Sequence, residues 1–407
     1  MKILIVTQWF DPEPTFKGII FAKGLVEAGH EVEVITGIPN YPGGKFYDGY
    51  KFKLHHKEKI EGITLHRVGL YPSHDSGALK RIANYVSFAL TSSLCGVFSA
   101  SKPDIIYSYH PPLTTALSAW VISLFRRAPF VVDVQDLWPD TLAATGMLNN
   151  KKILAIVNLF CNFVYKKASR IVVLSPGFKA KLIERGVPEE KVEIIYNWSD
   201  EKALKNGCFT EQKLPENGNK NIVFAGNLGI AQGLPAIVKA AQILQEREEK
   251  VNIVFIGDGI DKINAIEMAK DLKLNNTFFL ERVPMNEVGS LLKQSDFLLV
   301  HLINDILFSI TIPSKVQAYL AIGKPILMAV NGDAAELIKE SNTGVICESD
   351  NSLSIADGAS SLMRMSQTEL DKLALNSSSF YTKELSTSVG ISKFTQVFKE
   401  VYDETYF

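Results

Sequence analysis

The sequence has no long apolar run. No uncharged apolar segment reaches about 18 residues, the length typical of a membrane-spanning helix, so we expect no such helix. The first residues, Met1-Lys2 and an apolar strand, are not followed by a small-residue cleavage site, and we expect no signal peptide. A composition of 46% hydrophobic and 21% charged residues is typical of a soluble globular protein. We therefore expect a cytoplasmic protein.

Cysteine is scarce, and neither sign of charge dominates. The four cysteines lack the spacing of metal or redox motifs, so we expect reduced, mostly buried thiols. They are Cys95, Cys161, Cys208 and Cys347. The formal net charge is −1, but Lys and Arg outnumber Asp and Glu in residues 1–198, and the reverse holds in the rest. This asymmetry weakly favours an anionic partner for the first half, and we do not expect that partner to be nucleic acid.

At 407 residues the chain is too long for one ordinary core, so we expect two domains. Residues 1–198 form the first and 199–384 the second. The last helix, at about 385–407, is assigned to the first domain, with packing on the second as the alternative. Strands alternate with helices in both halves, which predicts two α/β domains with doubly wound parallel sheets. The expected strands are Ile3–Thr7, Glu31–Thr36, Asp104–Tyr107, Phe130–Val134, Ile171–Leu174 and Val192–Ile195, then Asn221–Ala225, Ile253–Ile256, Thr277–Leu280, Phe297–Val300 and Ile326–Ala329.

The segment 221–234, NIVFAGNLGIAQGL, combines a strand, a glycine turn and the start of a helix. Gly226 and Gly229 let an anion approach the backbone without meeting a Cβ atom, and the helix end adds positive potential. We therefore predict a phosphate site at this turn. An ordinary strand-to-helix turn is about as common.

Other polar residues follow strands of the second domain. Gly257 and Asp258 follow one strand, and Arg282-Val283 follows the next, so they face the same crevice as Gly226. Ser314 and Lys315 open a helix, where a hydroxyl, backbone N–H groups and a cation can meet a diphosphate. The alternative for Ser314 is a simple helix cap.

The first domain carries His110 and Asp136 at strand ends, where a side chain can exchange a proton or bond a hydroxyl. A structural imidazole is an equal alternative for His110. Lys17-Gly18 precedes a helix and suits a phosphate or sugar contact, although a plain helix start fits as well. The loop 37–50, rich in glycine and aromatic residues, suits a sugar or lipid contact, or is merely a long connection.

Three helical segments of the first half are apolar with basic ends. They are Lys80–Lys102, a segment closed by Arg126-Arg127, and Lys151–Arg170. Each alone is typical of a helix packed on a sheet. Together they favour contact with an anionic membrane surface.

Eight motifs follow one another along the chain. They are PEPTFKG at 12–18, PNYPGG at 39–44, DLWPD at 136–140, SPGF at 175–178, YNWSD at 196–200, GNLGxxQG at 226–233, GDG at 257–259 and PSKxQxYLAxGKP at 313–325. In this order they resemble the retaining glycosyltransferases of family 4, which have the GT-B fold with two domains facing a central cleft. Within that family the chain is most similar to bacterial fucosamine transferases of capsule and O-antigen assembly.

The resemblance implies transfer of a sugar, such as N-acetylfucosamine, from a UDP-sugar to a polyprenyl-diphosphate-linked glycan. It also implies a location at the inner face of the cell membrane. No metal or other cofactor is expected, because helix ends and side chains carry the diphosphate charge. His110, Asp136 and Lys315 are the implied catalytic residues. In retaining members the leaving phosphate helps to deprotonate the incoming hydroxyl.

Donor contacts carry over with departures. Gly226, Gly229 and Gly233 match the family's phosphate turn, but Asn227 and Gln232 stand where the family often has Arg and Lys, which leaves Lys315, Lys17 or Arg282 to take part of the charge. Two family glutamates correspond to Ile310 and Ala318. Gln317, next to the second, is a candidate ribose contact, and Asp305 lies upstream of the first.

Two other functions compete with transfer. A UDP-sugar epimerase of the same fold would need several acids and bases in the cleft. The missing glutamates make a non-catalytic partner of nucleotide or polysaccharide machinery the other alternative.

Overall fold

The computed structural model describes residues 1–73, 78–144, 147–148, 150–205 and 210–407. It divides into unit 1, Met1–Tyr196 with Gly390–Phe407, and unit 2, Asn197–Val389. The boundaries expected from the sequence are 198/199 and about 384/385. Cys95, Cys161 and Cys347 are buried free thiols, whereas Cys208 lies outside the described residues.

Unit 1 is built on an eight-stranded sheet in the order β3-β4-β2-β1-β5-β6-β7-β8. All neighbouring strands are parallel except the β3–β4 pair. The strands are β1 Lys2–Val6, β2 Glu31–Gly37, β3 His55–Ile60, β4 Ile63–Val68, β5 Ile105–His110, β6 Phe130–Val134, β7 Arg170–Val173 and β8 Val192–Ile194. The expectation of about six strands is wrong because it omits β3 and β4, whose sequences HHKEKI and ITLHRV are too polar to suggest strands.

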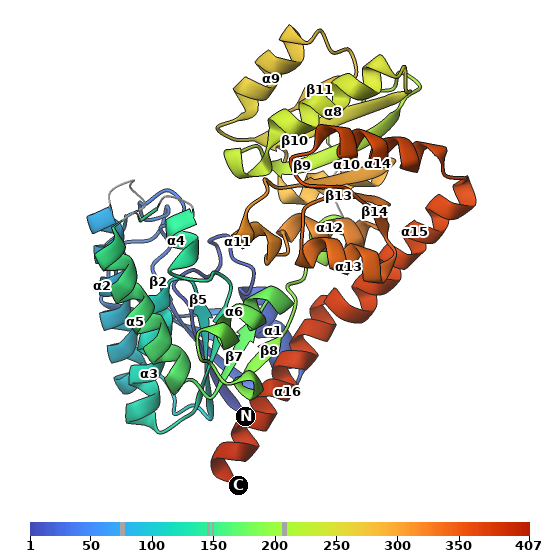
Figure 1. The fold of residues 1–407 in the computed structure, drawn as a ribbon. Coiled ribbons are helices and arrows are strands. Elements are labelled where there is room, and N and C mark those ends of the chain that lie inside the picture. The colour runs from blue at the N-terminus through green and yellow to red at the C-terminus, as the bar shows by residue number, and fades with distance from the viewer. Residues whose placement is uncertain (74–77, 145–146, 149, 206–209) are drawn as a thin grey trace. The chain divides into compact units, whose positions relative to one another are not determined.

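Helices cover both faces of this sheet. They are α1 Ile19–Glu27, α2 Ala78–Phe98, α3 Leu113–Arg126, α4 Asp140–Ala144, α5 Lys151–Lys167, α6 Pro176–Glu184 and α16 Thr387–Tyr406. Figure 1 shows α2, α3 and α5 along one face, and α1 with α16 along the other. Helix α16 fits closely on α1 because Gly24 has no side chain; a Cβ there would lie 2.0 Å from Ile391. No helix within the described ranges is long and apolar enough to span a bilayer.

Unit 2 has a fully parallel six-stranded sheet in the order β11-β10-β9-β12-β13-β14. Its strands are β9 Lys220–Asn227, β10 Val251–Asp258, β11 Thr277–Leu280, β12 Phe297–His301, β13 Ile326–Ala329 and β14 Gly344–Ile346, the last of which the sequence did not suggest. Its helices are α7 Glu201–Lys205, α8 Leu234–Glu246, α9 Lys262–Asp271, α10 Met285–Gln294, α11 Ile306–Ser309, α12 Ser314–Ile322, α13 Asp333–Ser341, α14 Ser352–Arg364 and α15 Gln367–Phe380. The prediction of two doubly wound parallel-sheet domains is confirmed.

Candidate active site

Among the parallel strands, the strand order reverses beside β1 in unit 1 and beside β9 in unit 2. Parallel α/β sheets bind ligands at the carboxyl ends of the strands next to such a reversal. In unit 2, β9 and β12 pair only at Ile222–Phe297 and Val223–Leu298, although both strands continue beyond. Tyr319 of α12 accepts a hydrogen bond from the Ala225 amide (2.9 Å) and so ties α12 to the open part of β9.

The glycine turn follows directly from β9. Gly226 is exposed with φ +132°, and its strand partner Gly257 has φ +146°. A Cβ on Gly257 would lie 1.9 Å from the Gly226 carbonyl oxygen, so this close approach requires glycine. Beyond the turn, the short helix Ile230–Gln232 leads to Gly233, whose φ of +57° starts α8. The structure therefore places an accessible glycine backbone at the reversal point.

Two amides of the turn are already hydrogen-bonded. The Leu228 amide donates to the Asp258 carbonyl (2.9 Å), and the Gly229 amide donates to Gln232 Oε1 (3.1 Å). Gln232 Oε1 also accepts from Asn227 Nδ2 (3.2 Å). The predicted phosphate turn therefore offers no free amide at Leu228 or Gly229. Gln232 acts here as a cap that holds the turn closed.

Lys315 is brought to the same place by α12. Its Nζ lies 3.4 Å from the Phe224 ring centre, and an ideal Cβ on Gly226 would be 3.8 Å from that nitrogen. Nζ is buried and has no hydrogen-bond partner in the described part of the chain. Burial lowers the pKa of Lys315 to about 7. Because a buried ammonium needs a partner, this arrangement has the chemistry of an anion site that lacks its anion.

The start of α12 differs from the expected serine cap. Pro313 is in the cap position, and Ser314 is the first helical residue, exposed and without a capping hydrogen bond. Gln317 is only 3% exposed, and its amide nitrogen, oriented to donate, bonds the carbonyl oxygens of Pro313 and Ser314 (2.9 Å each). The structure thus uses Gln317 within its own helix, which does not support the predicted ribose contact.

The remaining expected donor residues of unit 2 differ in environment. Asp258 is exposed at the end of β10 and accepts from the Gly259 amide (2.9 Å). Arg282 is exposed and Val283 half-buried just after the edge strand β11. Asp305 caps α11 by accepting from the Leu307 amide (2.7 Å), so it does not replace a family glutamate.

His301, at the end of β12, is a site residue that the sequence reasoning missed. It is fully buried, its Nδ1 lies 2.7 Å from the Gln232 carbonyl oxygen, and its Nε2 accepts from the Asp350 amide (3.1 Å). These partners require a neutral ring with the proton on Nδ1, and burial lowers the pKa of His301 accordingly. His301 therefore fastens the glycine turn to the next strand. The available signal was a histidine after an apolar run, as at His110.

In unit 1, His110 ends β5 beside the reversal point. Its ring is buried, with neither nitrogen hydrogen-bonded within the described ranges, and packs edge-on to Trp138 at 5.5 Å between ring centres. Burial lowers the pKa of His110 to about 3, so the ring is neutral at pH 7. Asp136 follows β6, is partly buried, and has a pKa raised by burial. A neutral imidazole with two unused nitrogens can bond a hydroxyl but is a weak base.

Aromatic rings collect at the same edge of unit 1. Trp9 and Tyr41, both half-buried, have ring centres 4.8 Å apart. Glu13 joins their loops, because its carboxylate accepts from the amides of Asn40 (2.7 Å) and Tyr41 (2.8 Å). Burial raises the pKa of Glu13 to about 7. Flat apolar faces beside polar groups suit a sugar ring.

Lys17 and Gly18 do not form the expected anion contact. The Lys17 ammonium is 1% exposed and paired with the buried carboxylate of Asp133, and it lies 4.7 Å from the Phe394 ring of α16. Gly18 is buried, and Asp11 Oδ2 accepts from the Ile19 amide (2.7 Å). The protein's own carboxylates therefore satisfy the cation and this helix start, which contradicts the predicted role of both residues.

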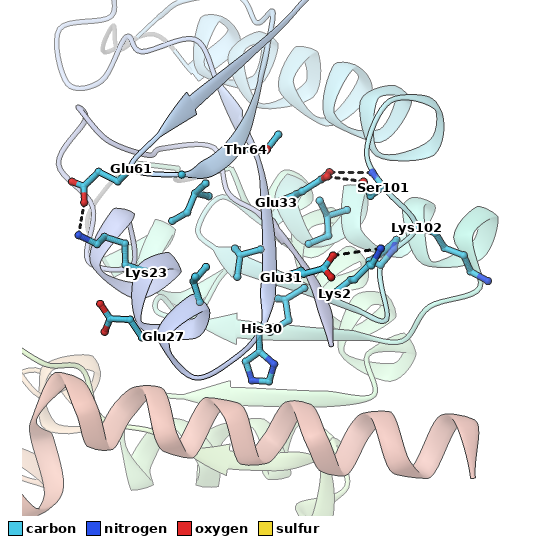
Figure 2. A pocket seen from close by; sticks show the side chains of 17 residues that line it. Lys2, Lys23, Glu27, His30, Glu31, Glu33, Glu61, Thr64, Ser101 and Lys102 are labelled. Carbon is cyan, nitrogen blue, oxygen red and sulfur yellow. Dashed lines mark hydrogen bonds and ion pairs between the residues drawn. The ribbon is translucent and has the colours of Figure 1, made fainter.

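A cavity of about 470 Å³ in unit 1 is not part of this site. It lies at the amino-terminal ends of β1, β2 and β4, whereas His110 and Asp136 follow carboxyl ends. Figure 2 shows that charged side chains lining it pair with one another, including Lys2 with Glu31 (3.4 Å) and Lys23 with Glu61. Its charge is therefore largely compensated by the protein itself.

Two doubly wound units in one chain define the architecture of GT-B glycosyltransferases, and comparisons with known proteins agree. Residues 21–198 match the family described as glycosyl transferase 4-like domain, and residues 209–376 match glycosyl transferases group 1. These matches together span most of the chain. The protein is therefore a glycosyltransferase of the GT-B type, with a 4-like first domain and a group 1 second domain.

Relatives and solved structures give the same picture. WcaI of Escherichia coli, a glycosyl transferase assigned to colanic acid biosynthesis, is 29% identical over 345 residues, which cover 79% of this chain and 82% of WcaI. WbjE of Pseudomonas aeruginosa, also named as a glycosyltransferase, is 27% identical over 64% of each chain. The structure of Anabaena HepE with UDP matches 98% of this chain and 100% of that chain, with a TM-score of 0.68 and 14% identity.

Proposed function

We propose that this glycosyltransferase moves a sugar, such as N-acetylfucosamine, from a UDP-sugar to a polyprenyl-diphosphate-linked glycan during synthesis of a bacterial surface polysaccharide. The observation that carries the donor assignment is the buried Lys315 Nζ beside Gly226, which contacts the Phe224 ring but has no hydrogen-bond partner among the described residues. The UDP named in the Anabaena structure supports the nucleotide. The colanic acid role in the name of WcaI supports the polysaccharide pathway.

In this proposal unit 2 holds the donor and stabilises the leaving group. Charge develops on the β-phosphate as the bond to the sugar breaks, and a preorganised cation stabilises that charge in a water-poor site. Lys315 and the first amides of α12 supply this stabilisation, and Ser314 adds an exposed hydroxyl. The leaving phosphate then takes the proton of the incoming hydroxyl on the same face of the sugar, which gives retention. No metal takes part in this scheme.

Unit 1 holds the acceptor in the proposal. His110 bonds an acceptor or sugar hydroxyl as a neutral ring, because its low pKa keeps the imidazole uncharged at pH 7. Asp136 provides a carboxylate at the same edge of the sheet, because it follows β6, the strand that pairs with the His110 strand β5. Trp9 and Tyr41 offer the aromatic surface for a sugar ring.

Membrane association is the second part of the proposal, and exposed apolar side chains support it. Helix α2 has an exposed stripe at every fourth position, and α3 and α5 add further exposed residues with basic ends. The residues are Ile82, Val86, Leu90, Leu94 and Phe98 on α2, Leu124 and Phe125 on α3, and Ile156, Leu159 and Phe160 on α5. Figure 1 shows these three helices on one face of the unit 1 sheet. Apolar residues flanked by lysines suit an anionic bilayer surface.

The transfer reaction is tested with labelled UDP-sugars and a lipid-linked acceptor. Label in the lipid phase, undiminished by EDTA and with the donor's anomeric configuration in the product, supports the proposal. An altered sugar that stays on UDP indicates an epimerase instead. Binding without turnover indicates a partner protein. Loss of activity with EDTA that Mg²⁺ or Mn²⁺ restores and Zn²⁺ does not contradicts the metal-independent mechanism.

The membrane surface is tested by sedimentation with vesicles that contain or lack anionic lipid. Leu94→Ser removes a residue that is 60% exposed on α2, and Leu375→Ser removes one that is 65% exposed on α15 of unit 2. We expect only Leu94→Ser to weaken binding to anionic vesicles. Equal binding of both variants and the wild type would show that α2 does not contact the bilayer.

A further inference from the structure

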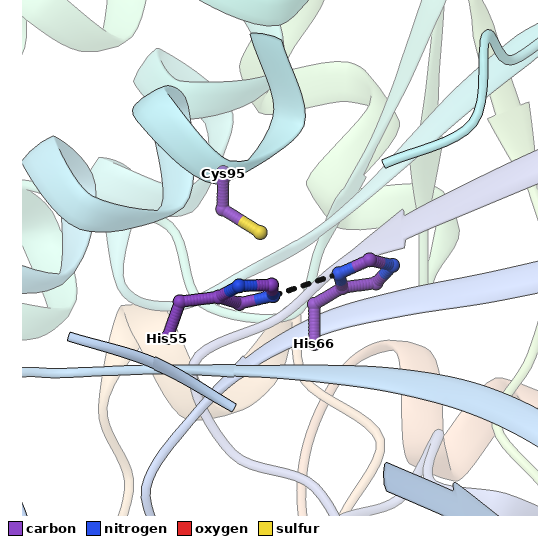
Figure 3. A group of neighbouring side chains, drawn as sticks. All are labelled: His55, His66 and Cys95. Carbon is purple, nitrogen blue, oxygen red and sulfur yellow. Dashed lines mark hydrogen bonds between the residues drawn. The ribbon is translucent and has the colours of Figure 1, made fainter. Parts of the chain in front are cut away.

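Three potential metal ligands meet on unit 1, away from the residues assigned to transfer. His55 comes from the edge strand β3, His66 from β4 and Cys95 from α2. One ligand atom of each lies within 4.8 Å of the other two. Figure 3 shows the Cys95 sulfur directed toward the two imidazole rings, whose facing nitrogens, His55 Nε2 and His66 Nδ1, are 3.0 Å apart.

The surroundings orient the buried histidine for metal binding. His66 Nε2 lies 3.1 Å from a carboxylate oxygen of Glu33, which is itself held by the Ser101 amide (3.0 Å) and hydroxyl (2.6 Å). The carboxylate keeps the ring proton on Nε2 and leaves the lone pair of Nδ1 facing His55 and Cys95. A carboxylate on the far nitrogen is the usual support of a metal-bound histidine, because it fixes the tautomer and raises basicity.

The spacing of the two ring nitrogens is close to that of a tetrahedral site. With metal–nitrogen bonds of about 2.0–2.1 Å, two nitrogens on one tetrahedral ion are about 3.3 Å apart, and sulfur lies about 3.6 Å from each. The observed nitrogen separation of 3.0 Å needs only a small turn of the rings, and the sulfur, within 4.8 Å of both nitrogens, reaches the ion by a change in the Cys95 side-chain torsion. Two imidazoles and one thiolate select a borderline-soft ion such as zinc rather than magnesium or calcium.

We propose that His55 Nε2, His66 Nδ1 and Cys95 Sγ bind one Zn²⁺ ion, with a water molecule in the fourth position. Binding forms two nitrogen–zinc bonds and one sulfur–zinc bond. The Cys95 proton is released to solvent, and the His55 ring proton moves from Nε2 to Nδ1. The ion links β3, which pairs only with β4 in the sheet, to α2, and so fastens the edge of unit 1.

The site is tested by titrating the full chain, purified without a histidine tag, with Co²⁺ as a probe for zinc. We expect one equivalent to bind, with the intense visible bands of a tetrahedral ion and a near-ultraviolet thiolate-to-cobalt charge-transfer band, both removed by added Zn²⁺. Cys95→Ser should abolish the charge-transfer band, whereas Cys347→Ser, a buried thiol of unit 2, should keep it.

Substitutions at His55 and Glu33 separate metal binding from folding. His55 is exposed, so His55→Gln should fold normally yet lose tight binding, whereas His56→Gln on the same strand should bind as the wild type does. Glu33→Gln should weaken binding about 10- to 100-fold. Zn²⁺ should raise the melting temperature of the wild type but not of His55→Gln.

Three results would overturn the assignment. These are the absence of a charge-transfer band in the wild type, the same band in Cys95→Ser, and unchanged affinity or zinc stabilisation in His55→Gln. Any of them would show that His55 and His66 only form a hydrogen bond between β3 and β4.

Discussion

The Lys315 ammonium makes the affinity of this chain for UDP depend on pH. Burial lowers its pKa to about 7 in the free protein, where no described residue forms a hydrogen bond with Nζ. A diphosphate beside Nζ favours the charged form and returns the pKa toward its ordinary value. Binding therefore takes up a proton wherever the free amine is neutral, and UDP affinity must fall as pH rises above 7.

The size of the effect follows from the charged fraction. At pH 8.5 about 3% of a group with a pKa of 7 is protonated, so affinity should be about 30-fold lower than at pH 6, a cost of about 2 kcal/mol. Near pH 8.5 each binding event should take up close to one proton. Lys315→Met removes both effects and, at pH 6, loses one charge-assisted contact of roughly 1.5–3 kcal/mol.

Calorimetry in buffers of different ionisation enthalpy measures both the affinity and the proton uptake. UDP has its own phosphate ionisation near pH 6, so the informative quantity is the difference between wild type and Lys315→Met at each pH. Lys324→Met, at the other end of α12, controls for general loss of positive charge. A wild-type profile parallel to that of Lys315→Met would refute the placement of the diphosphate on Lys315.

Three further outcomes test the surroundings of the site. Gly226→Ala should cost about 1–3 kcal/mol of stability and weaken UDP binding, because φ +132° is strained for any side chain; an unchanged denaturant midpoint would contradict this. His301→Gln should loosen the turn and raise the Kd for UDP with little change in the wild-type pH profile, as calorimetry would show. Folding raises the pKa of Glu13 to about 7, so its contribution to the free energy of unfolding is complete below pH 4.5 and falls by about 3 kcal/mol as pH rises to 7. Urea unfolding of Glu13→Gln should lack this pH-dependent loss of stability.

The features that the sequence predicted are those that depend on local backbone geometry. Gly226 and Gly257 occupy φ values that favour glycine, and a glycine after an apolar strand is visible in one short segment. Lys315 could be predicted because its helix opens with proline and follows a loop. Its neighbour Phe224 is far in sequence, but the parallel-sheet pattern already places the ends of β9 and α12 at the same edge.

The errors involve contacts that only folding creates. The position of Lys17 near a helix start is typical of a phosphate ligand. Its actual partner, Asp133, could not be inferred because it lies 116 positions away in the sequence. Gly18 is closed by Asp11 rather than open to a ligand. His301 was missed because the predicted strand stops at Val300, one residue short of the side chain that holds the turn.

Asn227 and Gln232 stand where the family often has Arg and Lys, and this reduces the exposed positive charge at the glycine turn. Gln232 Oε1 accepts from both Asn227 Nδ2 and the Gly229 amide, so these two side chains shape the turn without adding charge. The charge that the structure places beside Gly226 is Lys315, which is buried. Salt screens exposed charges well and buried ones poorly. Donor affinity in this chain should therefore respond strongly to pH and only weakly to ionic strength, whereas exposed Lys and Arg at positions 227 and 232 would give the reverse.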